Sequence, residues 1–262
     1  MTNTINLAET KTHAKKLFKN NFAPLCGGFL CVALCFMLFD AVVSLLGVFL
    51  ADVISGYYIL PVVVFIGVLI SPVINGFFRL CIKLAKNNTA NVYDVFYYFS
   101  SPSRYFDGFT INILLLLRLI IVAVIFSALP VSLWYLRGFI TVVPEYNLRI
   151  ILHCIWGVMF LAGLLLYSFR YFLVYTIYEE NNGEFINACF VRSAKIMNGA
   201  NIKLVLYNLF SFIPLYLLGI FIIPILCVVP YYILCCCLLS LKIYYAYLRK
   251  RAAAQKVPEI IG

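Results

Sequence analysis

The stretch FAPLCGGFLCVALCFMLFDAVVSLLGVFLA, residues 22–51, decides the fold because it holds one charged side chain, Asp40, in thirty positions. A helix rises about 1.5 Å per residue and the hydrocarbon core of a bilayer is about 30 Å thick, so about 20 apolar residues cross it. The rest of the chain has the same character, since 65% of its 262 residues are hydrophobic, 11% are charged and the mean hydropathy is +1.01. A soluble fold does not hide so much apolar surface, and the sequence predicts an integral membrane protein.

Apolar runs of similar length recur along the chain. The last of them, residues 202–248, is too long for one span, and Pro224 and Pro230 break it near its middle because a proline removes a helical hydrogen bond. The predicted transmembrane spans are residues 22–51, 57–84, 109–136, 150–178, 202–223 and 226–248. We therefore predict an all-α fold, in which a single membrane domain, residues 1–262, forms a polytopic bundle of about six transmembrane helices in three hairpins.

A polar segment precedes each pair of spans, at residues 5–20, 90–104 and 184–198. At helical spacing the apolar side chains of each segment share one face. These side chains are Leu7, Ala14, Leu17 and Phe18 in the first segment, Val92, Val95, Phe96 and Phe99 in the second, and Phe185, Ala188, Cys189, Ala194 and Met197 in the third. The pattern favours three repeats of an interfacial amphipathic helix followed by a hairpin. The alternative is that the segments are ordinary polar linkers.

The distribution of Lys and Arg predicts the orientation, since cytoplasmic loops of membrane proteins carry an excess of basic residues. Seventeen basic residues fall in or beside the N-terminal segment, the two longer polar connections and the C-terminal end, whereas only Arg137 and Arg149 fall on the other side. We expect a multi-pass protein of the plasma membrane with cytoplasmic N- and C-termini. The net charge of +10 does not indicate nucleic-acid binding, because the basic residues form short clusters between apolar runs.

Two stretches carry a family pattern. One is Asn75-Gly76-Phe77-Phe78-Arg79-Leu80, followed by Val92-Tyr93-Asp94-Val95-Phe96-Tyr97-Tyr98-Phe99, and the other is Arg192-Ser193-Ala194-Lys195-Ile196-Met197-Asn198-Gly199, followed later by Pro230-Tyr231-Tyr232. From about Lys11 to Arg249 the chain resembles the uncharacterised bacterial membrane-protein family called domain of unknown function 975. It departs from the pattern at Phe212-Ile213-Pro214, where an aromatic and glycine-rich stretch is expected. The resemblance implies a multi-span bacterial inner-membrane protein without an established activity, and it transfers no functional residues.

Two charged residues lie deep inside predicted spans. Asp40 is about 18 residues into the first span and Arg118 about ten residues into the third, and a charge at mid-bilayer costs at least about 2.5 kcal/mol. Both spans start on the predicted cytoplasmic side, so the two residues differ in depth by roughly 12 Å, a gap that a long arginine and proline kinks narrow. We predict a buried ion pair between Asp40 and Arg118, which either fixes helix packing or belongs to a substrate or ion path.

Arg79 and Arg170 lie in the inner thirds of the second and fourth spans. Arginines at such positions extend to lipid phosphates. The sharper hypothesis is that these two contact the head group of an anionic lipid. The predicted partners are the lipid bilayer and anionic lipids of the inner leaflet, with a homo-oligomer or other membrane proteins as further alternatives.

The sequence predicts no catalytic, metal or cofactor site. Its two histidines are predicted on opposite sides of the membrane, His13 ahead of the first span and His153 near the outer end of the fourth. Neither a zinc motif nor a G-x-x-x-x-G-K-[ST] phosphate loop occurs. The ten cysteines include no C-x-x-C pair, and we interpret those within apolar runs as small buried hydrophobic side chains. We therefore expect a protein that is not an enzyme.

Two functions remain open from the sequence. The first is an accessory or interaction protein that organises lipids or partners. The alternative is a small transporter or permease component that uses Asp40 and Arg118. A polar cavity that reaches both residues would favour transport, and a dry bundle would favour the accessory role.

Overall fold

A computed structural model describes residues 5–50, 67–135, 145–181, 185–197, 200–214 and 222–256. Within these ranges the chain is helical and contains no strand, which confirms the all-α prediction. Five helical stretches are long and apolar enough to cross a bilayer. They are Phe22–Leu45, Gly67–Asn87, Pro102–Phe126, Ile150–Glu180 and Ile225–Ala253.

The described elements follow the predicted order of segments. They are α1 (Leu7–Asn20), α2 (Phe22–Leu50), α4 (Pro72–Asn87), the 3₁₀ helix η2 (Val92–Phe99), α5 (Pro102–Tyr135), α6 (Glu145–Arg170), α7 (Val174–Glu180), α8 (Ile186–Ile196), α9 (Ala200–Ser211) and α11 (Ile222–Lys256). The predicted span 57–84 begins outside the described residues. The predicted span 202–223 is represented by α9, whose 12 residues extend only about 18 Å, and residues 215–221 lie outside the described part.

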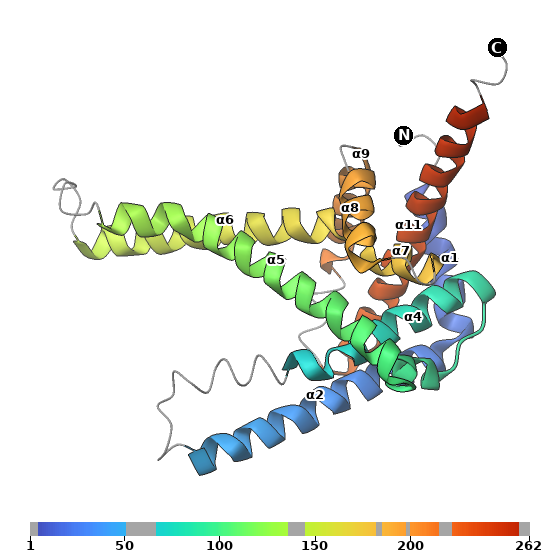
Figure 1. The fold of residues 1–262 in the computed structure, drawn as a ribbon, viewed down its shortest axis with the longest axis horizontal. Helices are drawn as coiled ribbons and strands as arrows, with labels where there is room; N and C mark the ends of the chain where they lie inside the picture. Colours follow the sequence, from blue (N-terminus) through green and yellow to red (C-terminus); the bar gives the residue numbers. More distant parts are fainter. Residues whose placement is uncertain are drawn as a thin grey trace.

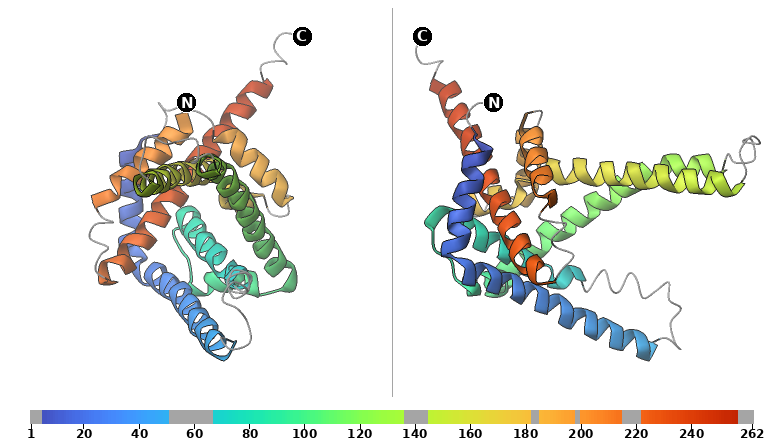
Figure 2. Two further views of the ribbon diagram at one scale, coloured as in Figure 1. Left: turned by 90° about the vertical axis from the view of Figure 1, so that its left-hand side faces the viewer. Right: turned by 180° about the vertical axis from the view of Figure 1, so that it is seen from behind.

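Helices α5 and α6 lie side by side as an antiparallel hairpin that extends away from the rest of the molecule (Figures 1 and 2). Helix α2 extends separately in a similar general direction. Helices α1, α4 and α7 gather around α11 at the end opposite to the tip of the α5–α6 hairpin (Figure 1), and η2 packs on α4. We call this end the terminal end, because α1 and the C-terminal part of α11 lie there.

The outward faces of the long helices are apolar. Met37 and Leu38 on α2 and Val124 on α5 are between 65% and 68% exposed, and only 6% of the most apolar window of each helix is buried within the protein. Helices of this kind are stable only where hydrocarbon or another protein covers them, because such an apolar surface in water favours aggregation. The pattern is that of a membrane-embedded protein.

The close contact between α4 and η2 depends on Gly76. The backbone of Val95 passes so near that a Cβ on Gly76 would lie 1.8 Å from the Val95 carbonyl oxygen. Beside it, the Asn75 side-chain amide donates a hydrogen bond to the carbonyl oxygen of Gly108 at 2.9 Å, and this joins α4 to α5. The Asn75-Gly76 pair of the sequence pattern is thus where three elements meet.

All three predicted amphipathic segments contain helices, α1, η2 and α8. In η2 the buried residues are Val95 and Tyr98, whereas Phe96 and Phe99 are exposed. A 3₁₀ helix repeats every three residues, so Val95 and Tyr98 share one side of η2 and Phe96 and Phe99 share another. Phe185 directly precedes α8 and is 87% exposed.

Candidate functional site

The predicted fourth span is broken near its end. Helix α6 ends at Arg170, a turn follows, and α7 begins at Val174. A break of this kind frees backbone groups that must be satisfied inside the protein. The buried Ser193 hydroxyl of α8 does this, because it donates to the Arg170 carbonyl oxygen at 3.0 Å and accepts from the Leu173 N–H at 3.3 Å. Ser193 therefore fixes α8 across the break.

Replacing Ser193 with alanine should destabilise the protein by about 1–3 kcal/mol, since the Arg170 carbonyl and the Leu173 N–H then lose their side-chain partner in a buried place. Thermal unfolding of the purified protein in detergent measures this loss as a lower midpoint. Ser168→Ala is the matched control, since Ser168 is exposed on α6. Equal midpoints for the two variants would contradict this role of Ser193.

The break brings Arg118 of α5 against α8. Arg118 Nη2 donates to Asn187 Oδ1 at 3.4 Å, and the guanidinium carbon lies 3.8 Å from the ring centroid of Phe190 and 5.4 Å from that of Tyr171. Aromatic faces hold an arginine without neutralising its charge. Arg118 Nη1 is buried and has no hydrogen-bond partner. One nitrogen of this arginine therefore has unused hydrogen-bonding capacity.

Arg118, Arg170 and Lys195 surround a pocket of about 340 Å³. Its other described lining residues are Tyr171, Phe190, Val191 and Ala194, so no acidic side chain is among them. Arg170 and Lys195 are exposed and Arg118 is half-buried. Three cations around one concave surface favour a phosphate or carboxylate group, which arginine binds through paired N–H donors. We call this site the basic pocket.

A second group of charges joins α4 to α7 and η2. Arg79 pairs with Glu179, Lys83 with Asp94 at 2.9 Å and Lys86 with Glu180 at 2.9 Å. We call these six residues the ion-pair cluster.

The Arg79–Glu179 pair has two aromatic neighbours on η2. The Tyr98 hydroxyl donates to Glu179 Oε1 at 2.7 Å, and the Arg79 guanidinium lies over the Tyr97 ring, 3.4 Å from its centroid. Burial and the nearby Glu179 carboxylate raise the pKa of Tyr98 well above its ordinary value, so its hydroxyl remains protonated and a donor. Each charge in this pair therefore has a protein partner.

The structure separates the residues that the sequence analysis had paired. Arg170 lies at the basic pocket, but Arg79 lies in the ion-pair cluster, where Glu179 and Tyr97 hold it. Arg118 contacts α8 and not Asp40, which is exposed on α2. The described residues therefore do not form the predicted Asp40–Arg118 pair.

Helix α5 begins before the predicted third span, and this bears on the depth expected for Arg118. The helix starts at Pro102 and has 34 residues, so it extends about 51 Å, which is well beyond the thickness of the hydrocarbon core. Arg118 is level with the amphipathic α8, so it need not lie at mid-bilayer.

Lys195, Asn187, Glu179 and Glu180 were not among the predicted site residues. Lys195 lies within the family-like stretch, and the two adjacent glutamates directly follow the aromatic end of the fourth span. An acidic pair at that boundary was a signal that basic partners lie nearby. Nothing in the local sequence indicated which basic residues these are.

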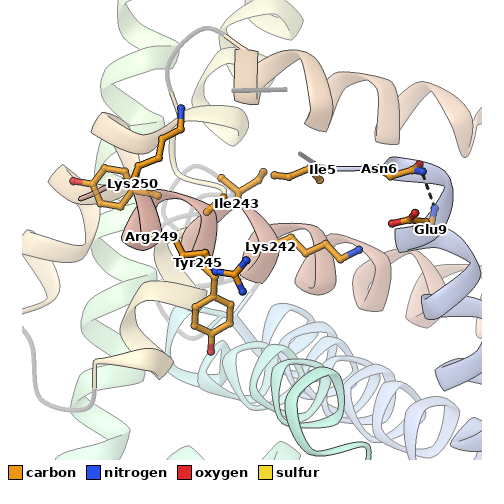
Figure 3. Close-up of a pocket in the computed structure, with 10 residues that line it drawn as sticks. Ile5, Asn6, Glu9, Lys242, Ile243, Tyr245, Arg249 and Lys250 are labelled. Atoms are coloured by element: carbon orange, nitrogen blue, oxygen red, sulfur yellow. Dashed lines mark hydrogen bonds between the residues drawn. The ribbon is translucent and has the colours of Figure 1, made fainter. Parts of the chain in front are cut away.

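A larger pocket of about 450 Å³ lies between α1 and α11 (Figure 3). Its basic residues do not converge, because the Lys242 and Lys250 amino groups point away from each other in this view. Lys242 donates to the Thr10 hydroxyl at 3.0 Å and so takes part in packing α1 against α11. Among the described residues, no group of three His, Cys, Asp or Glu side chains is placed to hold a metal ion.

The long apolar helices and their connected amphipathic segments define a multi-pass helical membrane protein. The chain belongs to the family described as protein of unknown function (DUF975), whose model matches residues 1–252, as the resemblance had indicated. Comparisons with curated proteins and with solved structures gave no match.

Proposed function

We propose that this membrane protein is a non-catalytic accessory protein that binds anionic lipid head groups and so organises lipids or partners around it. The observation that carries the proposal is the basic pocket, in which Arg118, Arg170 and Lys195 surround about 340 Å³ without an acidic lining residue. Phosphate is the anionic group that such a set of donors suits best, and a membrane offers it at high concentration in its phospholipids.

The position of the basic pocket supports a lipid ligand. Helix α8, which supplies Lys195, has a buried face formed by Cys189, Phe190 and Ser193, and Lys195 lies in its last turn. Beside this protein-facing side the helix also exposes the apolar Val191, which is 69% exposed, and helices that expose apolar and basic side chains together lie in the interface between hydrocarbon and head groups. With the orientation that the Lys and Arg distribution favours, this interface is that of the inner leaflet of a plasma membrane, and both termini are cytoplasmic.

A transporter that uses Asp40 and Arg118 is the alternative proposal. It requires a path that contains both residues. The lining of the pocket at Arg118 comes from α5, α6, α8 and the turn after α6, and includes no residue of α2, on which Asp40 lies. The contacts of Arg118 therefore support lipid binding over transport.

Removing the three charges together should weaken the binding of phosphatidylglycerol by on the order of 100-fold, because each basic residue near an anionic head group contributes about 1 kcal/mol. The test variant combines Arg118→Gln, Arg170→Gln and Lys195→Gln. Titration of delipidated protein with a fluorescent phosphatidylglycerol measures the change, and phosphatidylcholine serves as the uncharged reference.

The matched control combines Lys15→Gln, Lys16→Gln and Lys19→Gln, which removes the same charge from exposed positions on α1. The control should bind as the wild type does, and thermal midpoints show that both variants fold. Equal affinities of the two triple variants for phosphatidylglycerol would refute the proposal. A loss of substrate uptake only in the Arg118 variant, with unchanged lipid affinity, would favour transport instead.

A further inference from the structure

A second cavity, of about 330 Å³, lies beside the basic pocket. Tyr171 lines both, and Leu115 of the cavity is three residues from Arg118 on α5. Residues three apart on a helix are neighbours on its surface, so the two hollows adjoin each other at Tyr171 and along α5. Helices α4, α6, α7 and α11 supply the remaining walls of this cavity. We call it the tyrosine cavity.

Four of the hydroxyls around the tyrosine cavity have hydrogen-bond partners within the protein. The Tyr167 hydroxyl donates to the Leu115 carbonyl oxygen, and the Tyr175 hydroxyl donates to Asn112 Oδ1 at 3.0 Å. The hydroxyls of Thr176 and Ser240 bond each other at 2.6 Å.

Ring surfaces form much of the remaining wall. Phe78 stacks on Tyr175 with ring centroids 4.7 Å apart, and Tyr171 and Phe172 add further ring surface. Because these four hydroxyls bond within the protein and rings and aliphatic side chains line the rest, the cavity offers mainly apolar surface to an occupant. A polar occupant would lose its hydrogen bonds to water there, whereas a hydrocarbon chain would not.

Resting on the proposed function, we propose that the tyrosine cavity holds one acyl chain of the same phospholipid whose phosphate occupies the basic pocket. The ligand is then an intact anionic phospholipid and not a soluble phosphate compound. Charge complementarity at Arg118, Arg170 and Lys195 and the position of the apolar cavity directly beside them, with Tyr171 lining both, together select this occupant. A soluble anion would fill the basic pocket alone and leave the apolar walls without a partner.

A cavity-filling substitution tests the binding of the acyl chain separately from the binding of the head group. Ser168 lines the tyrosine cavity from an exposed position on α6, so Ser168→Trp should block the cavity without removing a buried contact or a charge. We expect about a tenfold weaker affinity for phosphatidylglycerol, since forcing a large group into an occupied site typically costs this much. Leu166→Trp is the matched control, because Leu166 is 58% exposed on the same helix and does not line the cavity.

Competition experiments identify which part of the ligand is required. Lysophosphatidylglycerol, which keeps one acyl chain, should displace fluorescent phosphatidylglycerol from the wild-type protein at a concentration at which glycerol 3-phosphate does not. Equal displacement by glycerol 3-phosphate at that concentration would overturn the inference in favour of a soluble anion. Unchanged affinity in Ser168→Trp would overturn it as well.

The proposed function and this inference fail in different ways. If the basic-pocket triple variant binds phosphatidylglycerol as the wild type does, the head-group site is absent and both fail. If the triple variant loses affinity and Ser168→Trp does not, head-group binding stands and only the place of the acyl chain is wrong. Loss of affinity in both variants, with Leu166→Trp unaffected, supports both.

Discussion

Replacing Gly76 with alanine should prevent α4 and η2 from packing and leave little folded protein. The new Cβ would lie 1.8 Å from the Val95 carbonyl oxygen and 2.5 Å from its carbonyl carbon. These are backbone atoms, so no side chain can rotate to relieve the contact, and η2 as a whole must move away. Overpacking of a well-packed core typically costs 1–3 kcal/mol and sometimes more, and a contact this short with backbone belongs at or above the top of that range.

The matched control for Gly76→Ala is Gly157→Ala on α6. No atom lies within 4 Å of a Cβ at Gly157, and alanine favours a helix over glycine by about 1 kcal/mol, so this variant should be at least as stable as the wild type. Monodispersity on size-exclusion chromatography and the thermal midpoint in detergent compare the two. A Gly76→Ala protein that elutes and unfolds like the wild type would show that η2 does not pack on α4 in this way.

Replacing Glu179 with leucine should cost about 3–5 kcal/mol, the range found when one partner of a buried ion pair is removed. The Glu179 side chain is only 8% exposed, and its loss leaves the Arg79 charge and the Tyr98 hydroxyl without their acceptor. Glu179→Gln should be milder, because an amide oxygen still accepts from Tyr98. Glu9→Gln, at an exposed position on α1, is the control and should change the midpoint little.

A double substitution tests whether the Arg79–Glu179 pair itself accounts for the loss. Arg79→Leu together with Glu179→Leu leaves no buried charge unpaired, so the double variant should be more stable than the Glu179→Leu variant alone. Thermal unfolding of the two single variants, the double variant and the wild type gives the coupling between the residues. If the two losses simply add, the residues do not stabilise the fold as a pair.

Hydropathy and charge distribution were sufficient to predict the long membrane helices and the three amphipathic segments. Bilayer thickness sets the length of an apolar run, and a position at the membrane interface requires one apolar and one polar face. The type of helix inside those segments could not be predicted from the sequence. In η2 the spacing that buries Val95 and Tyr98 is that of a 3₁₀ helix, and packing against Gly76 of α4 accompanies this geometry. A single sequence does not reveal such an exchange of helix type, since it depends on a neighbour 19 residues away from Val95.

The sequence identified some residues of the candidate site but not how the fold brings them together. Arg118 and Arg170 were recognised as basic residues within predicted spans, but their common pocket depends on the α6–α7 break that Ser193 of α8 holds in place. The pairing of Arg79 with Glu179 joins residues 100 positions apart, so it follows from the tertiary fold and not from spacing along the chain. Hydropathy also did not indicate that the helix carrying Arg118 begins at Pro102, seven residues before the predicted third span.

Native mass spectrometry of the protein extracted in a mild detergent tests the central claim most directly, because it identifies the lipids that remain bound. The wild-type protein and the Lys15, Lys16 and Lys19 control should each retain one anionic phospholipid per chain, and the Arg118, Arg170 and Lys195 variant should lose it. Retention of the same anionic lipid by that variant, or equal retention of phosphatidylcholine by the wild type, would contradict a phosphate site in the basic pocket.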